Sequence, residues 1–544
     1  MPTKSPYPDI DIPDVDLWGF IFERKNRPFP DSQVVFRDVH KPDTRVYTFA
    51  DVRKAAITFG TGLRSEWDWA KNEVLALYTP NDIDVPAIIY GTLWAGGIVT
   101  PANPAYSAEE LAFQLKDAEA KALVTTVAYL DTALKAAAKC GIPTNRVLVL
   151  GEKDEQRRVK HWTQIVNLSR SSYYRRRKAN PDKDLAFLVY SSGTTGLPKG
   201  VMLSHRNMVS VVLQNEGGGC YVYGRDKYLA ILPFYHIYAL TTIVHQMLHR
   251  GFEAVVMPAF EMKTFLKAIQ EHRITMVYVA PPVIVRLARD PEAEKYDLSS
   301  LLNITSGAAP LTGELVHAIH KKFGIKITQA YGLSETSPTT HIQPWDEWLT
   351  ALGSVGKLVP NMTAKYISED GTEAAPGQPG ELWLSGPNVF KGYWKNPTAT
   401  AASITEDGYF KTGDVGFADD QHNFYITDRL KELIKYKGFQ VAPAELEGKL
   451  LAHPNVADVA VIGVMDTVNH TEVPRAYVVA AADGAKTSEA GEEIVEWLSQ
   501  QVAHHKRLRG GVVFVDEIPK SASGKILRRI LKERAKKEGV KAKL

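Results

Sequence analysis

The sequence predicts a two-domain α/β protein whose large N-terminal part contains doubly wound, parallel sheets. Short apolar runs alternate with helical patterns through about the first 430 residues, which is typical of parallel sheets covered by helices on both faces. The chain has 544 residues, more than one typical domain of about 100–200 residues. The predicted buried strands are Val74–Tyr78, Ala122–Thr125, Val147–Leu150, Leu185–Val189, Ala254–Met257 and Met276–Val279, and helices are expected at Ala108–Ala120 and Phe265–Arg273.

The pattern changes twice toward the C-terminus. Between about Gly353 and Ile426, short apolar stretches separated by Gly, Pro and Asn turns predict an antiparallel, barrel-like piece. A further α+β unit follows, with the boundary placed at Asp428–Lys431. We therefore expect an N-terminal domain over residues 1–427 and a C-terminal domain over 428–544. The second domain is predicted to contain a helix at Pro443–Ala452, a strand at Val459–Ile462 and a helix at Glu492–His504.

Composition argues against several classes of protein. The net charge of +3 is too small for a nucleic-acid surface, and the basic run Arg175–Lys178 is expected to be a solvated loop. Cys140 and Cys220 are the only cysteines and lie in no CxxC pattern, which argues against a disulfide framework or zinc site and favours a reducing compartment. Because no stretch of about 18 uninterrupted apolar residues occurs, we expect no transmembrane helix.

The two ends of the chain bear on localisation. The N-terminal Met1–Pro6 has no apolar core of the kind that a secretory signal needs. The final Ala542-Lys543-Leu544 is close to the Ser-Lys-Leu peroxisomal address. We expect a peroxisomal protein that meets the import receptor through this tripeptide, with the cytoplasm as the alternative.

The most informative segment is the loop Tyr190–Gly200, which follows a predicted buried strand. Its glycines let backbone N–H groups turn toward an anion, its hydroxyls donate further hydrogen bonds, and its lysine adds a full charge. Each hydrogen bond to a charged oxygen contributes about 1.5–3 kcal/mol, so the loop predicts a polyphosphate site, although its spacing is not that of a P-loop. The residues expected to contact phosphate are Ser191, Ser192, Gly193, Thr194, Thr195 and Lys199.

Five further segments carry side chains suited to a nucleotide. Ser306–Pro310 consists of small residues that leave room for a flat ring. Gln329–Glu335 offers an aromatic face, a hydroxyl and a carboxylate, and Tyr409–Asp414 places an acid after a tight turn, suited to ribose hydroxyls. Asp428–Gly438 opens the C-terminal unit, and Ile518–Lys525 puts a lysine on a Gly/Ser loop.

In this order the six segments resemble the adenylate-forming enzymes, namely acyl-CoA synthetases, firefly-type luciferases and nonribosomal peptide adenylation domains. The resemblance runs from about Tyr47 to Arg529, and Pro233–Leu240 and Tyr436–Glu447 are most similar to 4-coumarate–CoA ligase-like acyl-CoA synthetases. It implies an ATP-dependent ligase that uses Mg²⁺, activates a carboxylic acid as acyl-AMP with release of pyrophosphate, and then forms acyl-CoA. It also implies a mobile C-terminal domain that swings between the two half-reactions.

The resemblance gives individual positions a role. Lys525 would offset the repulsion between the carboxylate and the phosphate anions during adenylation. Lys435 would serve thioester formation, and Lys431 would be the hinge. His236 would lie between the acyl pocket and the thiol tunnel, and Glu335 would hold Mg²⁺. The nucleotide would also contact Ala308, Ala309, Gln329, Ala330, Tyr331, Ser334, Asp414 and Arg429, CoA would contact Lys437, Gly438 and Phe439, and the acyl group would contact Tyr238, Thr242 and Thr305.

The sequence defines the acid less closely than the reaction. No Asp or Glu occurs between Phe234 and Val244, where amino-acid-activating relatives place an acid, so a plain aromatic or medium-chain carboxylic acid is favoured. Plant coumarate ligases often carry lysine where this chain has Thr305 and Ala259. The resemblance therefore does not single out a hydroxycinnamate.

Three alternative functions stay open. A luciferase-like oxidase shares the adenylation half, but Tyr235–Tyr238 replaces the luciferin-binding His-His-Gly-Phe pattern. A stand-alone adenylating enzyme would load a carrier protein instead of CoA. A non-catalytic nucleotide-binding regulator would keep the phosphate loop but lose groups such as Lys525, Lys435 or Glu335, all of which are present.

Overall fold

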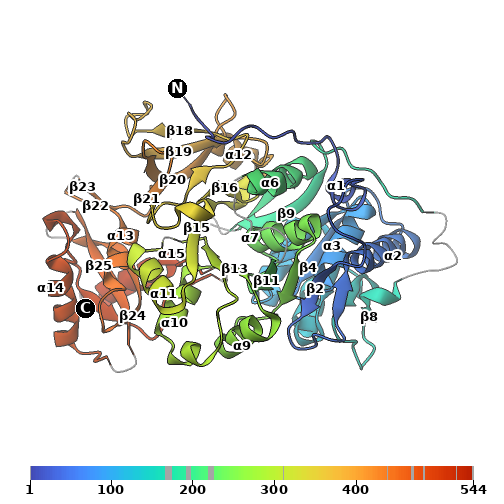
Figure 1. The fold of residues 1–544 in the computed structure, drawn as a ribbon, viewed down its shortest axis with the longest axis horizontal. Coiled ribbons are helices and arrows are strands. Elements are labelled where there is room, and N and C mark those ends of the chain that lie inside the picture. Colours follow the sequence, from blue (N-terminus) through green and yellow to red (C-terminus); the bar gives the residue numbers. More distant parts are fainter. Residues whose placement is uncertain are drawn as a thin grey trace.

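The computed structural model contains two large mixed sheets, an antiparallel sheet and a separate C-terminal unit (Figure 1). This arrangement confirms the predicted α/β class with a large N-terminal and a smaller C-terminal part. The structure describes residues 2–165, 174–191, 198–217, 226–309, 311–437, 439–466, 471–481, 484–521 and 524–541.

The first large sheet has seven strands in the order β10-β9-β5-β4-β6-β7-β8. Its strands pair in parallel except for the antiparallel edge pair β9–β10, which brackets the predicted phosphate loop. All five residues of β4 are buried, as expected for a central parallel strand with helices on both faces. The strands are β4 (Val74–Tyr78), β5 (Ile98–Ala102), β6 (Ala120–Thr125), β7 (Val147–Val149), β8 (Lys160–His161), β9 (Leu185–Ser191) and β10 (Lys199–Ser204).

The second large sheet has nine strands in the order β17-β16-β15-β14-β13-β11-β12-β2-β3. Its central strands are parallel, and antiparallel strands close both edges. The carboxyl ends of the parallel strands therefore meet at one edge, where open α/β sheets bind ligands. The strands are β2 (Val34–Asp38), β3 (Val46–Thr48), β11 (Lys227–Ala230), β12 (Glu253–Val256), β13 (Met276–Val279), β14 (Asn303–Ser306), β15 (Lys326–Gly332), β16 (Thr339–Ile342) and β17 (Lys357–Leu358).

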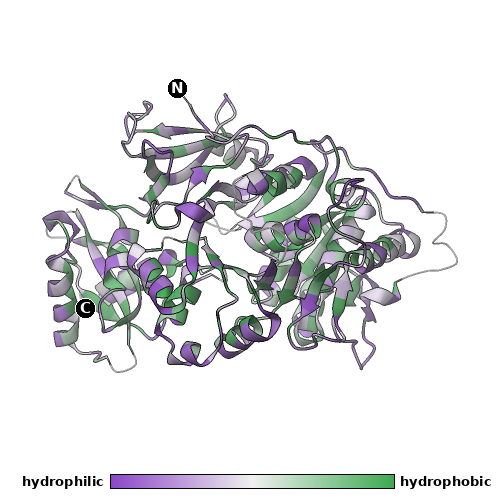
Figure 2. Cartoon of the chain, in the orientation of Figure 1, coloured by the Kyte–Doolittle hydropathy of each residue, from purple (hydrophilic) through white to green (hydrophobic). Residues whose placement is uncertain are grey.

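Helices form three layers around the two sheets, and apolar residues concentrate on the strands between them (Figure 2). α4 and α5 cover the outer face of the seven-stranded sheet, and α9, α10 and α11 cover the outer face of the nine-stranded sheet. The largest core cluster lies between the sheets and includes α1, α2, α3 and α6. The helices are α1 (Leu17–Phe22), α2 (Phe49–Trp67), α3 (Val85–Trp94), α4 (Ala108–Asp117), α5 (Leu130–Lys139), α6 (His205–Gly217), α7 (Ile237–Ala239), α8 (Gln246–Arg250), α9 (Met262–His272), α10 (Pro281–Arg289), α11 (Gly313–Phe323) and α12 (Pro397–Ser403).

Local sequence explains where several helices begin. The Thr48 and Ser107 hydroxyls accept from the backbone three residues later, and Asp51 and Glu110 close the two capping boxes. Such caps satisfy N–H groups that a helix leaves unpaired at its start. A π-helical turn, Leu240–His245, follows α7, and π-turns are frequent at functional sites.

The predicted antiparallel piece is a five-stranded sheet in the order β1-β18-β19-β20-β21. β19 alternates buried and half-buried residues, as a sheet with one covered face requires. β21 crosses the predicted domain boundary after residue 427 and ends at Arg429, so the division into domains stays a prediction. The strands are β1 (Thr3–Lys4), β18 (Thr363–Ile367), β19 (Gly380–Ser385), β20 (Phe410–Ala418) and β21 (Phe424–Arg429).

The C-terminal unit contains the predicted helices and strand around its own apolar clusters. In Figure 1 it lies beside α10 and α11 of the larger part. Within the described ranges, none of the helices combines the length and the hydropathy that a membrane span requires. The elements are β22 (Ile434–Tyr436), β23 (Phe439–Val441), α13 (Pro443–Leu450), β24 (Val456–Asp466), β25 (Thr471–Ala480), α14 (Ser488–Ser499), β26 (Val512–Phe514) and α15 (Arg528–Lys541).

Candidate active site

Tyr331, Asp414 and Arg429 form one polar unit, joined by a hydrogen bond and an ion pair. The Tyr331 hydroxyl, from β15, donates to Asp414 Oδ2 over 2.6 Å, and Arg429 Nε lies 3.1 Å from Asp414 Oδ1. Asp414 and Arg429 are register partners on β20 and β21, and Asp414 is 3% exposed. Burial, together with the charge of Asp414, raises the pKa of Tyr331 well above its usual value. Each carboxylate oxygen keeps a further lone pair with which it can accept a ribose hydroxyl.

Glu335 lies beside the start of the predicted phosphate loop, on the short 3₁₀ turn Ser334–Thr336. Its Oε1 accepts hydrogen bonds from the Ser191 hydroxyl at 3.3 Å and the Tyr393 hydroxyl at 2.9 Å. Tyr393 was not predicted as a site residue, and its only sequence signal is a tyrosine among the aromatic residues of Phe390–Trp394.

Lys199, the predicted cation of the phosphate loop, lies at the start of β10. Its Nζ lies 5.0 Å from the centroid of the Tyr393 ring, within cation–π distance. Ser191 and Lys199 are therefore placed on adjacent strands at the two ends of the loop. The predicted contacts Ser192, Gly193, Thr194 and Thr195 lie outside the described residues.

The other predicted nucleotide contacts line up along the carboxyl ends of β14 and β15. Ala308 follows β14, is exposed and adopts a φ of +72°, while Ala309 and Ala330 are half-buried. Gln329 is 4% exposed, and its backbone exchanges hydrogen bonds with Gln343 rather than with a site residue. Ser334 is half-buried on the turn that carries Glu335.

The turn that carries Lys525 packs directly against the N-terminal part. Gly524 has a φ of +83°, and a Cβ at this position would stand 3.0 Å from Ala280 Cβ. Lys525 N donates to Ser521 Oγ over 3.1 Å, which closes the turn. Glycine is therefore needed for both the conformation and the close approach.

Lys525 shares its environment with the Asp414–Arg429 pair and Glu335. Burial first and the charge of Arg429 second lower the pKa of Lys525 to about 8, whereas Glu432, Asp414 and Glu335 act in the opposite direction. The predicted adenylation lysine thus lies within the electrostatic reach of the predicted ribose and metal residues.

His236 precedes α7 and also lies near Lys525. Burial and, secondly, the charge of Lys525 lower the pKa of His236 to about 4, so its imidazole is neutral at neutral pH. The Tyr238 backbone N–H points to His236 Nδ1 at 3.3 Å, which assigns the ring proton to Nε2. His236 can therefore donate a hydrogen bond to an oxygen in the site.

The three predicted acyl-pocket residues lie together between α7 and the nine-stranded sheet. The Tyr238 hydroxyl donates to the Thr305 carbonyl over 3.3 Å, and the Tyr238 ring meets Tyr278 edge to face at 5.9 Å. Thr242 bonds the Tyr238 carbonyl one turn earlier. The Thr305 hydroxyl shares hydrogen bonds with Thr328 and Asn303, so it is already partnered.

Asn81 connects the two large sheets just behind this region, and the sequence prediction missed it. Its amide nitrogen donates to the Leu232 and Met257 carbonyls over 2.9 and 3.2 Å, and its Oδ1 accepts from Phe234 N over 2.7 Å. The side chain is 4% exposed. Asn81 thereby fixes the segment that leads to His236, although a single Asn before a helix carries no sequence signal for this role.

The described residues predicted for the second half-reaction are exposed. Lys435 and Lys437 are exposed on the β22–β23 hairpin, and Phe439 is 56% exposed and stacks on His505. Lys431, the predicted hinge, is also exposed. Gly438 and the tripeptide Ala542–Leu544 lie outside the described residues, so their predicted roles, including the peroxisomal address, stay predictions.

Glu335 is the carboxylate predicted to bind Mg²⁺. In the described part of the chain, no group of three or more His, Cys, Asp or Glu side chains could hold a metal ion. Glu335 nevertheless fits a metal carried by the substrate, because Mg²⁺ in phosphoryl-transfer sites is usually held by one or two carboxylates plus phosphate oxygens. Among the described residues, both hydrogen-bond donors to the Glu335 carboxylate are neutral hydroxyls.

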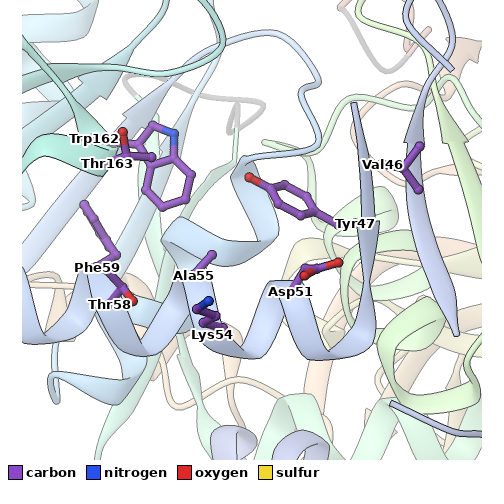
Figure 3. Close-up of a pocket in the computed structure, with 9 residues that line it drawn as sticks. All are labelled: Val46, Tyr47, Asp51, Lys54, Ala55, Thr58, Phe59, Trp162 and Thr163. Atoms are coloured by element: carbon purple, nitrogen blue, oxygen red, sulfur yellow. The ribbon is translucent and has the colours of Figure 1, made fainter. Parts of the chain in front are cut away.

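A pocket of about 380 Å³ lies apart from these residues, between β3, α2 and the 3₁₀ turn Trp162–Gln164 (Figure 3). Tyr47, Phe59 and Trp162 are its aromatic lining residues, and Tyr47 and Trp162 both donate to the Asp84 carboxylate. None of the predicted site residues lines it.

Comparison with known proteins identifies the family of the chain. Residues 22–394 match the AMP-binding enzyme family, and residues 445–525 match the AMP-binding enzyme C-terminal domain. The chain is 38% identical to a probable 4-coumarate–CoA ligase 1 of Dictyostelium discoideum over 97% of both chains, and 37% identical to the 4-coumarate–CoA ligase of Pinus taeda over 98% of this chain and 97% of that one. Its fold superimposes on the anthranilate CoA ligase AuaEII in complex with anthranoyl-AMP with a TM-score of 0.88, at 22% identity over 97% and 99% of the two chains. The chain therefore belongs to the AMP-binding enzyme family.

Proposed function

We propose that this protein is an AMP-forming acid–CoA ligase that activates a carboxylic acid as acyl-AMP and then transfers the acyl group to CoA. One observation carries the proposal. Lys525 of the C-terminal unit is half-buried within reach of the charges of Asp414, Arg429 and Glu335, which belong to three other segments of the chain. These charged groups are suited to bind a nucleoside triphosphate with its metal ion and to offset the charge of an attacking carboxylate. The relatives named as 4-coumarate–CoA ligases support the same reaction class.

In the first half-reaction, a carboxylate oxygen attacks the α-phosphorus of ATP, and the bond from that phosphorus to pyrophosphate breaks. Two anions must approach each other, so a preorganised cation contributes most where their charges meet. Lys525 supplies this cation, while Asp414 accepts from the ribose and Tyr331 provides a flat surface for adenine. The neutral His236 donates from Nε2 to an oxygen of the acid.

The polyphosphate is held at the opposite end of the site. Lys199 provides a positive charge and Ser191 a hydroxyl at the two ends of the phosphate loop. Glu335 would hold Mg²⁺ together with phosphate oxygens, and the metal would offset charge that the protein donors alone leave unbalanced.

In the second half-reaction, the CoA sulfur attacks the acyl carbon, the bond from that carbon to the AMP oxygen breaks, and the thiol proton leaves. Lys435, Lys437 and Phe439 are proposed to act only in this step. Their exposure in this structure is consistent with a unit that must rotate at Lys431 before they reach the site.

The acid is proposed to be a plain aromatic or medium-chain carboxylic acid. The predicted acyl-pocket residues Tyr238, Thr242 and Thr305, and the neighbouring Tyr278, are neutral, so no carboxylate among them would pair with the ammonium of an amino acid. An aromatic ring would find an edge-to-face partner in Tyr238 or Tyr278.

Pyrophosphate release across a panel of aromatic and aliphatic acids, with and without CoA, tests this function. We expect acid-dependent pyrophosphate release and, with CoA present, an acyl-CoA product. Accumulation of acyl-AMP without a thioester would instead support a luciferase-like or carrier-loading enzyme. Nucleotide binding with no turnover of any acid would favour a binding protein.

A further inference from the structure

We propose that Tyr393 is a positioning residue that holds the two oppositely charged groups of the polyphosphate site, Glu335 and Lys199, in place and apart before the nucleotide binds. The inference rests on the proposed function and adds a residue to it. Tyr393 contacts one group through its hydroxyl and the other through its ring face.

The hydroxyl side of Tyr393 sets the orientation of Glu335. It donates to Oε1 over 2.9 Å, and burial together with the Glu335 charge raises the pKa of Tyr393, so it stays a donor at neutral pH. A hydrogen bond to a carboxylate that binds a metal fixes the carboxylate and is worth about 10–100-fold in metal affinity. The second Glu335 oxygen has no hydrogen bond to any described residue and is free to face a metal.

The ring side of Tyr393 holds Lys199. The ammonium lies 5.0 Å from the ring centroid, where the negative face of the aromatic ring attracts a cation. Across the described part of the chain, no ion pair joins Lys199 to Glu335, although both contact the same tyrosine. The ring therefore offers Lys199 a weaker, neutral partner, which a polyphosphate can displace.

Backbone contacts place Tyr393 independently of its side chain. Tyr393 forms an antiparallel bridge with Val201, and Trp394 N donates to the Gly200 carbonyl over 2.7 Å. At the other end of the segment, Phe390 N donates to the Glu335 carbonyl over 2.8 Å. This segment thus links the strand of Lys199 to the turn of Glu335, and a variant at position 393 keeps these bonds.

The test compares Tyr393→Phe, which removes only the hydroxyl, with Tyr393→Leu, which also removes the ring. Binding is measured without acid, with a nonhydrolysable ATP analogue and Mn²⁺ as the paramagnetic probe of free and bound metal. We expect Tyr393→Phe to weaken Mn²⁺ binding in the nucleotide complex about tenfold and to leave metal-free nucleotide binding unchanged. Tyr393→Leu should weaken both. In turnover, excess Mg²⁺ should restore kcat in Tyr393→Phe.

Tyr47→Phe is the matched control, because Tyr47 also donates to a carboxylate, Asp84, over 2.9 Å, away from the site. It should change the thermal midpoint as much as Tyr393→Phe does and change neither binding constant. Unchanged Mn²⁺ affinity in Tyr393→Phe, or equal effects of Phe and Leu, would overturn the inference. A wild-type protein that binds the metal–nucleotide complex but makes no acyl-CoA would instead refute the proposed function.

Discussion

The C-terminal unit presents two lysine-bearing segments, and they differ in almost every physical respect. The Lys525 turn is half-buried and packs against Ala280, and partial burial and, secondly, the charge of Arg429 lower the pKa of Lys525 to about 8. Lys435 lies on an exposed hairpin, where its backbone N–H bonds Glu472. The two lysines cannot occupy one site at the same time if the C-terminal unit moves as a rigid body. The difference supports the proposal that this orientation serves adenylation and that the thioester step uses another.

The largest expected effect on the two half-reactions comes from replacing each of the two lysines by alanine, one at a time. Lys525→Ala should slow adenylation about a thousandfold, because a charge about 4 Å from the reacting phosphate contributes about 4 kcal/mol at an effective dielectric near 20. It should spare thioester formation from supplied acyl-AMP, and Lys435→Ala should do the reverse. Separate assays of pyrophosphate release and acyl-CoA formation measure this.

Lys486→Ala, at an exposed lysine of the same unit paired with Asp516, serves as the control and should leave both steps unchanged. Equal losses of both half-reactions in Lys525→Ala and Lys435→Ala would contradict the division of labour between the two segments.

The pH dependence of adenylation tests the burial of Lys525. The folded-state pKa of about 8 lies below the usual value of 10.5, so the residue loses its proton as the pH rises above about 8. Above about pH 8, kcat/KM for ATP should fall about tenfold per pH unit. The same shift gives a stability contribution that rises between pH 8 and 10.5, because the unfolded chain then binds more protons.

Lys525→Arg separates this titration from other effects, since a guanidinium stays charged over the whole range. Whatever its absolute rate, this variant should show no fall in kcat/KM between about pH 8 and 10. A fall identical to that of the wild type would assign the titration to another group.

Gly524→Ala should disturb only the turn that carries Lys525. Its Cβ would meet Ala280 at 3.0 Å in a left-handed conformation, so the turn must withdraw. We expect about a tenfold loss of adenylation with normal thioester formation from acyl-AMP.

Gly408→Ala is the control for strain alone, because Gly408 has the same φ of +83° and a Cβ added there would meet no atom within 4 Å. It should lower the thermal midpoint and leave adenylation intact, since left-handed strain costs about 1–2 kcal/mol. A similar loss of adenylation in both variants would show that close packing against Ala280 is unimportant.

The smallest effect is expected at the contact between the two parts of the chain. Arg289 of α10 donates to the Leu451 and Val456 carbonyls over 2.6 and 2.9 Å. Arg289→Ala should lower adenylation about threefold and leave the thioester step unchanged or faster, because it removes contacts made only in this orientation. Arg273→Ala, which breaks an exposed pair with Asp297, should change neither rate, and a matching loss there would count against the assignment.

The sequence was most informative where a physical signal is local. The apolar runs at Val74–Tyr78 and Met276–Val279 predicted β4 and β13 residue for residue, because buried parallel strands are written as continuous apolar stretches. The co-location of Glu335, Asp414 and Lys525 followed from the family resemblance, since their separation in sequence carries no geometric information.

Long-range partners were beyond sequence reasoning. Arg176 was expected in a solvated loop, yet it is mostly buried and paired with Asp16 and Glu23 at the two ends of α1. Tyr393 could not be distinguished from a core aromatic, because its role depends on two groups from different segments. The orientation of the C-terminal unit likewise depends on contacts such as that of Arg289, not on local pattern.

The bridge made by Asn81 has a consequence for changing what the protein accepts. The Asn81 side chain donates two hydrogen bonds and accepts a third, and these anchor the start of the segment that holds His236, while Tyr238 and Thr242 lie just beyond it. The Tyr238 and Thr242 side chains therefore shape the pocket, whereas the Asn81 hydrogen bonds position the imidazole. Libraries that vary Tyr238 and Thr242 while retaining Asn81 can therefore be screened for activity on new acids without disturbing the position of His236.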